Sequence, residues 1–300
     1  MQSESHSHSA RSTSIELSPS GAEAVRIDAA GATDVGRVRA ANEDAYLIAT
    51  LQRSIIVHAA SPAASGWFAG EPAGTLLVVA DGMGGQGGGD VASRVAVTAV
   101  VNHLLNCMPW GAISATPPKA HSPSLPGVRD ELSDALVAGD ERVKTAGAET
   151  GTPRMGTTLT LALVLWPMLY VAHVGDTRCY LQRGGKLECL TTDHTMAQRM
   201  ADASAHEVDP GSHLHHILWN SLGASEELPQ PEITRVDLQA GDVLLLCSDG
   251  LCKYIDDAQI AAILNTGESS ATRAQQLIDC ANAAGGADNI TAVVAQATRG

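Results

Sequence analysis

An apolar stretch that ends in an acid and a run of glycines is the part of the sequence with the clearest chemical potential. Residues 76–80 are uncharged and apolar, which is typical of a buried strand, and Asp81 follows them directly. Gly82 comes next, and glycine lets main-chain carbonyls approach a ligand closely. A carboxylate beside a carbonyl suits a hard divalent cation. The alternative is a strand–turn–helix junction with an acid that only caps it.

Three other acids stand in related positions. Asp176 and Asp249 each follow a short apolar run closely, whereas Asp288 lies in a glycine-rich turn just before one. Buried, unpaired carboxylates are costly, so several of them converging at strand ends would need cations. Two divalent ions would meet that need and would lower the pKa of a shared water, giving a hydroxide nucleophile at neutral pH. The spacing permits this convergence but does not require it.

Short motifs that contain these acids follow one another along the chain. They are Arg39-x-x-Asn42-Glu43-Asp44, Asp81-Gly82-Met83-Gly84-Gly85, Gly156-Thr157-Thr158, His173-Val174-Gly175-Asp176-Thr177-Arg178, Ser248-Asp249-Gly250 and Asp288-Asn289-Ile290-Thr291. The ordered series resembles the metal-dependent protein serine/threonine phosphatases (PPM, type 2C) in their bacterial form, over roughly residues 24–298. The resemblance implies an α+β fold, a four-layer α-β-β-α sandwich of two antiparallel sheets flanked by helices.

The resemblance also implies a set of metal ligands for two Mn²⁺ or Mg²⁺ ions and a third, weaker one. Asp81 resembles the carboxylate that bridges the two ions, with the Gly82 carbonyl on the second. Asp249 and Asp288 resemble the ligands that complete the first ion. The implied ligands in chain order are Glu43, Asp44, Asp81, Gly82, Asp176, Asp249 and Asp288.

The remaining roles follow in the same way. Glu43 and Asp44 resemble the acids that hold the second ion, largely through its waters. Asp176 matches a ligand of the third ion, shared with Asp249. Arg39 matches the arginine that binds the substrate phosphate, a role suited to a planar fork of donors. Arg39, Asp81 and Asp249 are the implied catalytic residues.

Several of these residues also have a purely structural interpretation. Arg39 could form a surface salt bridge, and Asp176 could cap the turn before Thr177. His173, within an apolar run, is typical of a hydrogen-bonded core histidine. The Gly156–Thr158 motif is expected to pack near the site, and Asn289 either belongs to a turn or orients Asp288.

One position departs from the animal members of the family. They follow the Asp-Gly pair with a histidine proposed to protonate the leaving group, and Met83 stands there in this chain, as in bacterial relatives. The general acid is therefore open between a metal-bound water and another residue. His194, in the Asp193-His194-Thr195 stretch, receives no catalytic assignment without geometry.

The elements that must position these residues are indicated by periodicity. Helices are expected from Asp90 to Leu105, over 128–148, over 257–264 and over 271–284. Strands are expected over 157–165, 169–174, 179–182, 243–247 and 290–295, with a hairpin turn at 183–186. Residues 50–74 are expected to form an inserted hairpin or loop, and residues 194–231 a functional flap.

Composition limits the class of protein. The net charge of −14 disfavours nucleic-acid binding, which needs clustered Lys and Arg. The six cysteines include no Cys-x-x-Cys pair, which favours free thiols in a reducing compartment. With no secretory signal or long apolar stretch, we expect a cytoplasmic protein that does not bind membranes. Residues 1–23 are expected to be a disordered tail, and residues 24–300 the catalytic domain.

We therefore predict a metal-dependent protein phosphatase that hydrolyses phosphoserine and phosphothreonine by attack of a hydroxide bridging two Mn²⁺ or Mg²⁺ ions. It is expected to act as a monomer on phosphoproteins, opposing a bacterial Ser/Thr kinase. One alternative is the same fold dedicated to a single regulator, such as a phosphorylated anti-sigma antagonist. A binding module without turnover would lack a metal carboxylate, and a calcium-binding structural protein would need a helix-loop-helix ligand pattern that the chain lacks.

Overall fold

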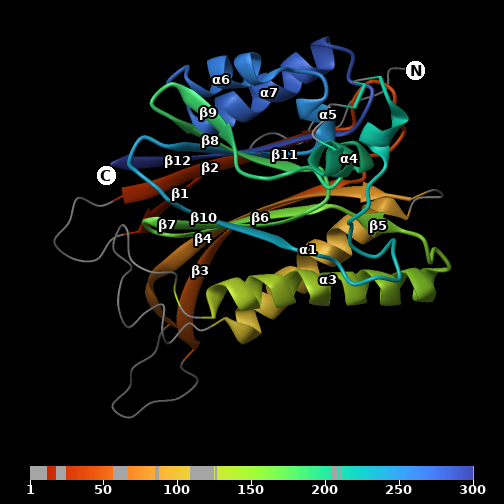
Figure 1. Cartoon of the computed structure of the whole chain (residues 1–300). Coiled ribbons are helices and arrows are strands. Elements are labelled where there is room, and N and C mark those ends of the chain that lie inside the picture. Colours follow the sequence, from red (N-terminus) through yellow and green to blue (C-terminus); the bar gives the residue numbers. More distant parts are fainter. Residues whose placement is uncertain are drawn as a thin grey trace, which may run out of the picture.

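A computed structural model describes residues 12–17, 25–56, 67–84, 88–108, 125, 127–204, 208–209 and 211–299. Two antiparallel sheets lie face to face between two layers of helices (Figure 1). The first sheet contains, in spatial order, β1 (Ser12–Leu17), β2 (Val25–Asp34), β12 (Ile290–Arg299), β11 (Val243–Cys247), β8 (Arg178–Arg183) and β9 (Lys186–Cys189). The second contains β10 (Glu232–Asp237), β7 (Met168–Val174), β6 (Leu159–Leu165), β4 (Trp67–Met83) and β3 (Asp44–Ile56), with β5 (Gly156–Thr157) paired to β4.

The helices cover the two outer faces of this sandwich (Figure 1). On the second sheet lie α1 (Gly89–Cys107) and α3 (Val128–Thr150). On the first sheet lie α5 (Asp249–Cys252), α6 (Asp257–Leu264) and α7 (Ser270–Ala283). Two short elements stand apart from these layers, α4 (Met196–Ser204) and the 3-10 helix η2 (His213–His216). The α+β class and the four-layer arrangement predicted from the resemblance are confirmed.

Continuous apolar strands arise because both faces of each central strand are covered. In β4, Leu76 and Val78 face α1 and α3, whereas Leu77 and Val79 face the other sheet. Successive side chains point to opposite faces of a sheet, so a strand that is buried on both faces has apolar residues at consecutive positions. Three apolar layers result, two between a sheet and its helices and one between the sheets.

The element boundaries match most of the expected ranges and differ in informative places. The helix expected over 128–148 is α3, the one expected over 257–264 is α6, and Arg183 pairs with Lys186 at the predicted hairpin. Within residues 50–74, the described parts extend β3 and β4 into a long hairpin with register shifts between residues 51 and 54. A register shift interrupts the alternation of side chains along a strand. These residues therefore lack the regular strand pattern even though their backbones pair.

The N-terminal stretch is a correction to the expected disordered tail over residues 1–23. Ser12–Leu17 form β1, which pairs with β2 in antiparallel register from Ser12–Ala30 to Leu17–Val25. The edge of β2 offers unpaired backbone groups, and their pairing overrides a polar composition. The other residues of 1–24 lie outside the described part of the chain. No helix within the described ranges is long and apolar enough to cross a membrane.

Candidate metal centre and active site

The predicted acids meet at one end of the sandwich, where strands of both sheets end. Asp44 begins β3 and is the register partner of Asp81 near the end of β4. From the first sheet, Asp249 follows β11 and Asp288 precedes β12, and Asp176 lies in the turn between β7 and β8. The antiparallel pairing therefore brings together acids that are far apart in the chain.

Asp44 joins the two sheets at this end. Its Oδ2 atom accepts hydrogen bonds from the Ser248 and Thr291 hydroxyls, both at 2.7 Å. Its Oδ1 atom is buried and has no hydrogen-bond partner among the described atoms. Removal from water raises the pKa of Asp44 to about 7, although the two hydroxyls oppose this and Asp249 adds to it. One oxygen is thus fixed in place while the other is left for a ligand that the polypeptide does not supply.

Asp81 is held through its backbone. Its N–H donates to Thr158 Oγ1 at 3.0 Å, and its carbonyl accepts from Thr158 N at 2.9 Å and Thr157 Oγ1 at 2.8 Å. Removal from water raises the pKa of Asp81 well above its ordinary value, and the charges of Asp44 and Asp249 raise it further. The Gly156–Thr158 motif therefore packs beside the site and fixes this carboxylate.

Gly82 and Gly89 allow α1 to begin against the site. A side chain on Gly82 would meet the backbone oxygens of Gly89 and Glu43 at 2.1 and 2.6 Å, and one on Gly89 would meet the Glu43 carboxylate carbon at 2.7 Å. The Glu43 carbonyl accepts from Gly82 N and from the Ser93 hydroxyl at 3.2 and 2.7 Å. Burial raises the pKa of Glu43, and the Gly89 N–H partly offsets this. The glycines are required by close backbone approach.

Arg39 lies at the edge of the centre. Its Nη2 atom donates to Asp288 Oδ2 at 2.8 Å, and half of its side-chain surface is exposed. The hydrogen bond to Asp288 raises the pKa of Arg39. Asn289 does not orient Asp288 through its side chain. Its amide donates to the Val35 and Ala41 carbonyls and its Oδ1 accepts from Glu43 N, so it fixes the loop that carries Arg39.

A lysine that the motifs did not single out lies among these acids. Lys253 Nζ donates to Asp249 Oδ2 at 2.5 Å and to Asp176 Oδ2 at 3.3 Å. Burial lowers the pKa of Lys253, but the charges of Asp249 and Asp176 outweigh it and raise the value overall. Burial raises the pKa of Asp176 to about 7, and Asp249 adds to this while Lys253 opposes it. The only sequence signal was the spacing of four residues from Asp249, which is common on helix surfaces.

The histidines near the centre are structural. His173 is buried, with Nδ1 2.8 Å from Thr160 Oγ1 and Nε2 3.1 Å from the Thr192 carbonyl, and burial lowers its pKa to about 3. His194 accepts from Gly175 N at 3.1 Å, and Asn220 Nδ2 lies 2.9 Å from the same Nδ1 atom. Burial lowers the pKa of His194 to about 4. The Nδ1 contacts of His194 position the turn before Asp176. Because the ring is neutral and enclosed, it is not placed to donate a proton to a substrate.

The expected flap over 194–231 is anchored at both ends and contains two helices that periodicity did not predict. Met196 N bonds the Ile217 carbonyl at 2.8 Å and Trp219 N bonds the His194 carbonyl at 3.0 Å. Beyond them, Leu222 exchanges two backbone hydrogen bonds with Thr157, both at 2.9 Å. The two ends of residues 196–217 are thus joined to each other, and we call this segment the excursion. Leu222 pairs with β5 of the second sheet.

The carboxylates fit divalent cations by the chemistry of their oxygen atoms, their burial and their charge. Oxygen donors suit Mn²⁺ and Mg²⁺. Asp44 has a buried oxygen without a partner among the described atoms, and the pKa values of Asp44, Asp81 and Asp176 are raised by burial and by the charge of Asp249. The charge of these acids is therefore only partly balanced by the polypeptide. Lys253 and Arg39 supply some positive charge, on Asp176, Asp249 and Asp288.

Comparison with known proteins gives one consistent family. The sequence profile of the family described as Protein phosphatase 2C matches residues 63–294. The Mycobacterium tuberculosis serine/threonine protein phosphatase PstP is 35% identical over 225 residues, which cover 73% of this chain and 40% of PstP. Protein phosphatase PhpP of Streptococcus pneumoniae is 31% identical over 221 residues, covering 72% of this chain and 83% of PhpP.

A solved structure agrees with these relatives. The catalytic domain of PstP in complex with two manganese ions superposes with a TM-score of 0.68 at 30% identity, covering 91% of this chain and 99% of that one. The chain spans about 40% of the length of full PstP. It belongs to the protein phosphatase 2C family of serine/threonine protein phosphatases, which are hydrolases.

Proposed function

We propose that this chain is a metal-dependent serine/threonine protein phosphatase that uses Mn²⁺ or Mg²⁺. The observation that carries the proposal is the group of acids at the strand ends, in which Asp44 keeps a buried oxygen without a partner. A buried polar atom without a partner costs free energy, so its retention calls for a ligand. The manganese ions of the PstP structure indicate which kind of ligand.

The ligand set follows from the predicted roles. Asp81, Asp249 and Asp288 would hold the first ion, and Asp81 would also hold the second. Gly82, Glu43 and Asp44 would complete the ligands of the second ion. When bound, such ions supply Lewis acidity and lower the pKa of a water molecule. The protein's contribution is to fix the carboxylates, through Thr157 and Thr158 on one side and Ser248 and Thr291 on the other.

Arg39 would bind the phosphoryl group of the substrate. Its guanidinium is half exposed, and Asp288 holds it at the edge of the centre through one nitrogen. The other donors of the fork remain suited to phosphate oxygens, which bind arginine in bidentate geometry. Met83 has no proton to donate and His194 is enclosed, so neither side chain is suited to act as the general acid.

The substrates that we propose are phosphoserine and phosphothreonine in proteins, including a cognate Ser/Thr kinase. The support is that PstP and PhpP, by their names, are protein phosphatases. We place the reaction in the cytoplasm and expect a monomer. The support for the cytoplasm is that all six cysteines are free thiols.

The test is phosphate release from a phosphothreonine peptide by chelator-stripped protein, with and without added Mn²⁺. We expect release only with the metal, and no release from an Asp81→Asn variant that unfolds cooperatively. Folded wild-type protein that stays inactive with both Mn²⁺ and Mg²⁺ would reject the proposal and favour a phosphoprotein-binding module.

A further inference from the structure

Lys253 contacts Asp176 and Asp249, and these contacts do not involve the buried Asp44 oxygen that lacks a partner within the described residues. Lys253 follows the single turn of α5, and its N–H bonds the Asp249 carbonyl at 2.9 Å. This turn directs the side chain back over Asp249, so that Nζ contacts the Oδ2 atoms of Asp249 and Asp176. The exposed fractions of the Asp176, Asp249 and Lys253 side chains are 7%, 16% and 28%.

Two carboxylate oxygens that converge in a shielded place are the donors that a divalent ion would use. Here an ammonium group already lies on both of them. An ammonium makes hydrogen bonds of about 2.7–2.9 Å to carboxylates, whereas Mn²⁺ or Mg²⁺ requires oxygens at roughly 2.1 Å. Because both cannot occupy the same pair of oxygens, the lysine competes directly with a third ion.

We propose that the ammonium group of Lys253 is the resident cation of the Asp176–Asp249 pair, so that this chain holds two divalent ions where the family resemblance implies three. The inference rests on the proposed metal-dependent function. In this arrangement the side chain of Lys253 supplies the positive charge that an exchangeable third ion would otherwise supply. Asp176 then acts as the counter-ion of Lys253 and not as a metal ligand.

The same ammonium reaches the excursion over residues 196–217. Lys253 Nζ lies 3.5 Å from Nδ1 of His216, in η2. Lys253 therefore contacts both the two acids of the centre and η2. Loss of the charge is expected to increase hydrogen exchange in η2 as well as to free the carboxylates.

The test counts bound ions and does not depend on activity. Metal-stripped protein is titrated with Mn²⁺, and the ions per chain are measured by equilibrium dialysis and by electron paramagnetic resonance of free Mn²⁺. We expect two ions for the wild type, three for Lys253→Met, and two again for Lys253→Arg and for the double variant Lys253→Met/Asp176→Asn. The matched control is Lys144→Met, because Lys144 forms an i,i+4 pair with buried Asp140 on α3, at 2.8 Å.

Each alternative outcome is decisive. Three ions in the wild type, or two in both the wild type and a folded Lys253→Met variant, would overturn the inference and leave the proposed function intact. No bound ions in any variant would reject the proposed function together with it.

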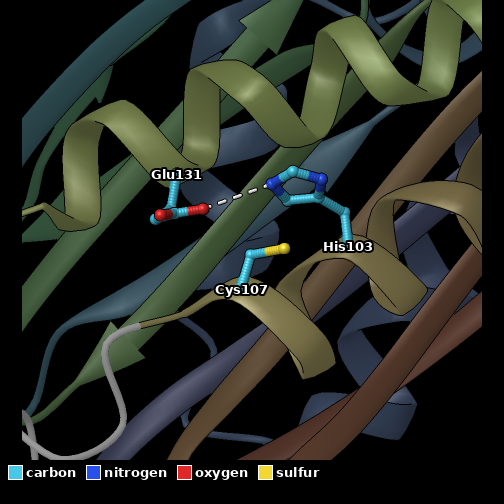
Figure 2. Close-up of side chains that lie close together, drawn as sticks. All are labelled: His103, Cys107 and Glu131. Carbon is cyan, nitrogen blue, oxygen red and sulfur yellow. Dashed lines mark hydrogen bonds and ion pairs between the residues drawn. The ribbon is translucent and has the colours of Figure 1, made fainter.

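An independent observation lies at the other end of α1. His103 and Cys107 stand one turn apart on α1, and Glu131 reaches them from the first turn of α3 (Figure 2). One donor atom from each lies within 4.8 Å of the others, and within the described residues this is the one such group of three or more His, Cys, Asp or Glu side chains. His103 is fourteen residues along the helix from Gly89, which corresponds to about 21 Å.

The donor types and one distance favour zinc. Imidazole, thiolate and carboxylate together suit Zn²⁺, whereas Mn²⁺ and Mg²⁺ prefer oxygen alone. His103 Nε2 and Glu131 Oε2 are 3.3 Å apart. Two ligands at Zn²⁺ distances of about 2.0–2.1 Å in a tetrahedron are about 3.3 Å apart, so this pair needs no rearrangement. Cys107 is exposed, which leaves room for the ion and a water.

We infer that His103, Cys107 and Glu131 form a Zn²⁺ site that joins the end of α1 to the start of α3. Its role would be structural, because an ion that binds the paired helices of the folded state and not the unfolded chain stabilises the folded state.

Cobalt provides the probe for this site. In wild-type protein, Co²⁺ should produce a thiolate-to-cobalt charge-transfer band, and Zn²⁺ should abolish the band and raise the melting temperature. Cys107→Ser should lose both effects, whereas Cys189→Ser, which removes another exposed thiol, should retain them. Absence of the band in the wild type, or its persistence in Cys107→Ser, would overturn the inference.

Discussion

At the scale of single residues, the acids of the centre differ in how much positive charge the chain itself supplies. Asp249 is paired with Lys253, just as the buried Asp242, outside the centre at the other end of β11, is paired with Arg183. Asp44 has only hydroxyl donors, on one of its two oxygens, and the pKa of Asp81 is raised by burial and by its acidic neighbours. The uncompensated acids are the ones on which a divalent ion should have the largest effect.

Replacing Asp81 should separate activity from stability. Asp81→Asn should lower turnover by about 10³-fold or more, because several kcal/mol of metal-dependent stabilisation would be lost. In chelator the same variant should melt at a higher temperature than the wild type, because it removes a repelled charge. The matched control is Asp242→Asn, which removes the carboxylate that pairs with Arg183 and should lower the melting temperature. Retained turnover in Asp81→Asn would count against the metal centre.

Arg39 should affect substrate binding more than turnover. Arg39→Ala is expected to raise KM for p-nitrophenyl phosphate by about 10-fold, the usual effect of losing hydrogen bonds to a charged group. Arg37→Ala is the control, because Arg37 lies on the same loop and bonds only the Asn282 carbonyl through its side chain among the contacts described. An unchanged KM for Arg39→Ala would reject phosphate binding by this residue.

At the scale of elements, the two ends of the segment over residues 196–217 are joined by backbone hydrogen bonds. Residues 194–196 pair with 217–219, and Arg199 of α4 stands over the Trp219 ring at 5.1 Å. Deleting the whole of 200–228 would also remove Asn220 and Leu222, which bond His194 and Thr157. Such a deletion would disturb the centre itself, so a smaller change is needed to test the excursion.

Replacing residues 205–211 by a Gly/Ser linker of equal length should distinguish protein substrates from small ones. The backbone pairing of residues 194–196 with 217–219 and the contacts of Asn220 would remain. The value of kcat/KM for p-nitrophenyl phosphate should therefore stay within about twofold. Turnover of a phosphoprotein should change more, because only a large substrate reaches the excursion. Equal effects on both substrates would show that the segment does not contribute to substrate selection.

At the scale of the whole molecule, a neutral histidine is built into the sheet beside the centre. His173 is buried between Thr160 and the Thr192 carbonyl, and its ring centroid is 4.7 Å from that of His194. Burial, with smaller contributions from His194 and Arg178, lowers the pKa of His173 to about 3. His173 therefore stays neutral in the folded protein at pH values at which the same histidine is protonated in the unfolded chain.

This predicts a loss of stability in acid that a substitution should reduce. Below pH 6.5 the unfolded state binds a proton that His173 does not, so the free energy of unfolding should fall as the pH drops towards 3. One such group corresponds to about 2 kcal/mol between pH 6.5 and 5. Asp44 and Asp176, whose pKa values are raised, act in the opposite sense in metal-free protein.

The comparison with a variant isolates the histidine. Urea unfolding of metal-free wild type and His173→Gln, at pH 7.5, 6.5 and 5, cancels the contributions of the acids that both proteins share. The wild type should lose more stability than the variant as the pH falls. Identical pH dependence in the two proteins would contradict a neutral His173.

The sequence by itself determined the layered fold, most of the regular elements and the acids at the strand ends. These are local signals: a continuous apolar run such as residues 243–247, followed by Asp249, already predicts a buried strand that ends in a carboxylate. The family resemblance added the expected roles, since the order of the motifs is a property of the sequence alone.

Only the tertiary structure decided how the charges at the centre are shared. Lys253 is four residues from Asp249 in the chain but seventy-seven from Asp176, and its bond to Asp176 exists because β11 pairs with β8. The pairing of β1 with β2, the closed base of residues 196–217 and the role of Asn289 are decided in the same way. Such contacts depend on which distant backbones come together, and neither local propensity nor hydrophobic period specifies that.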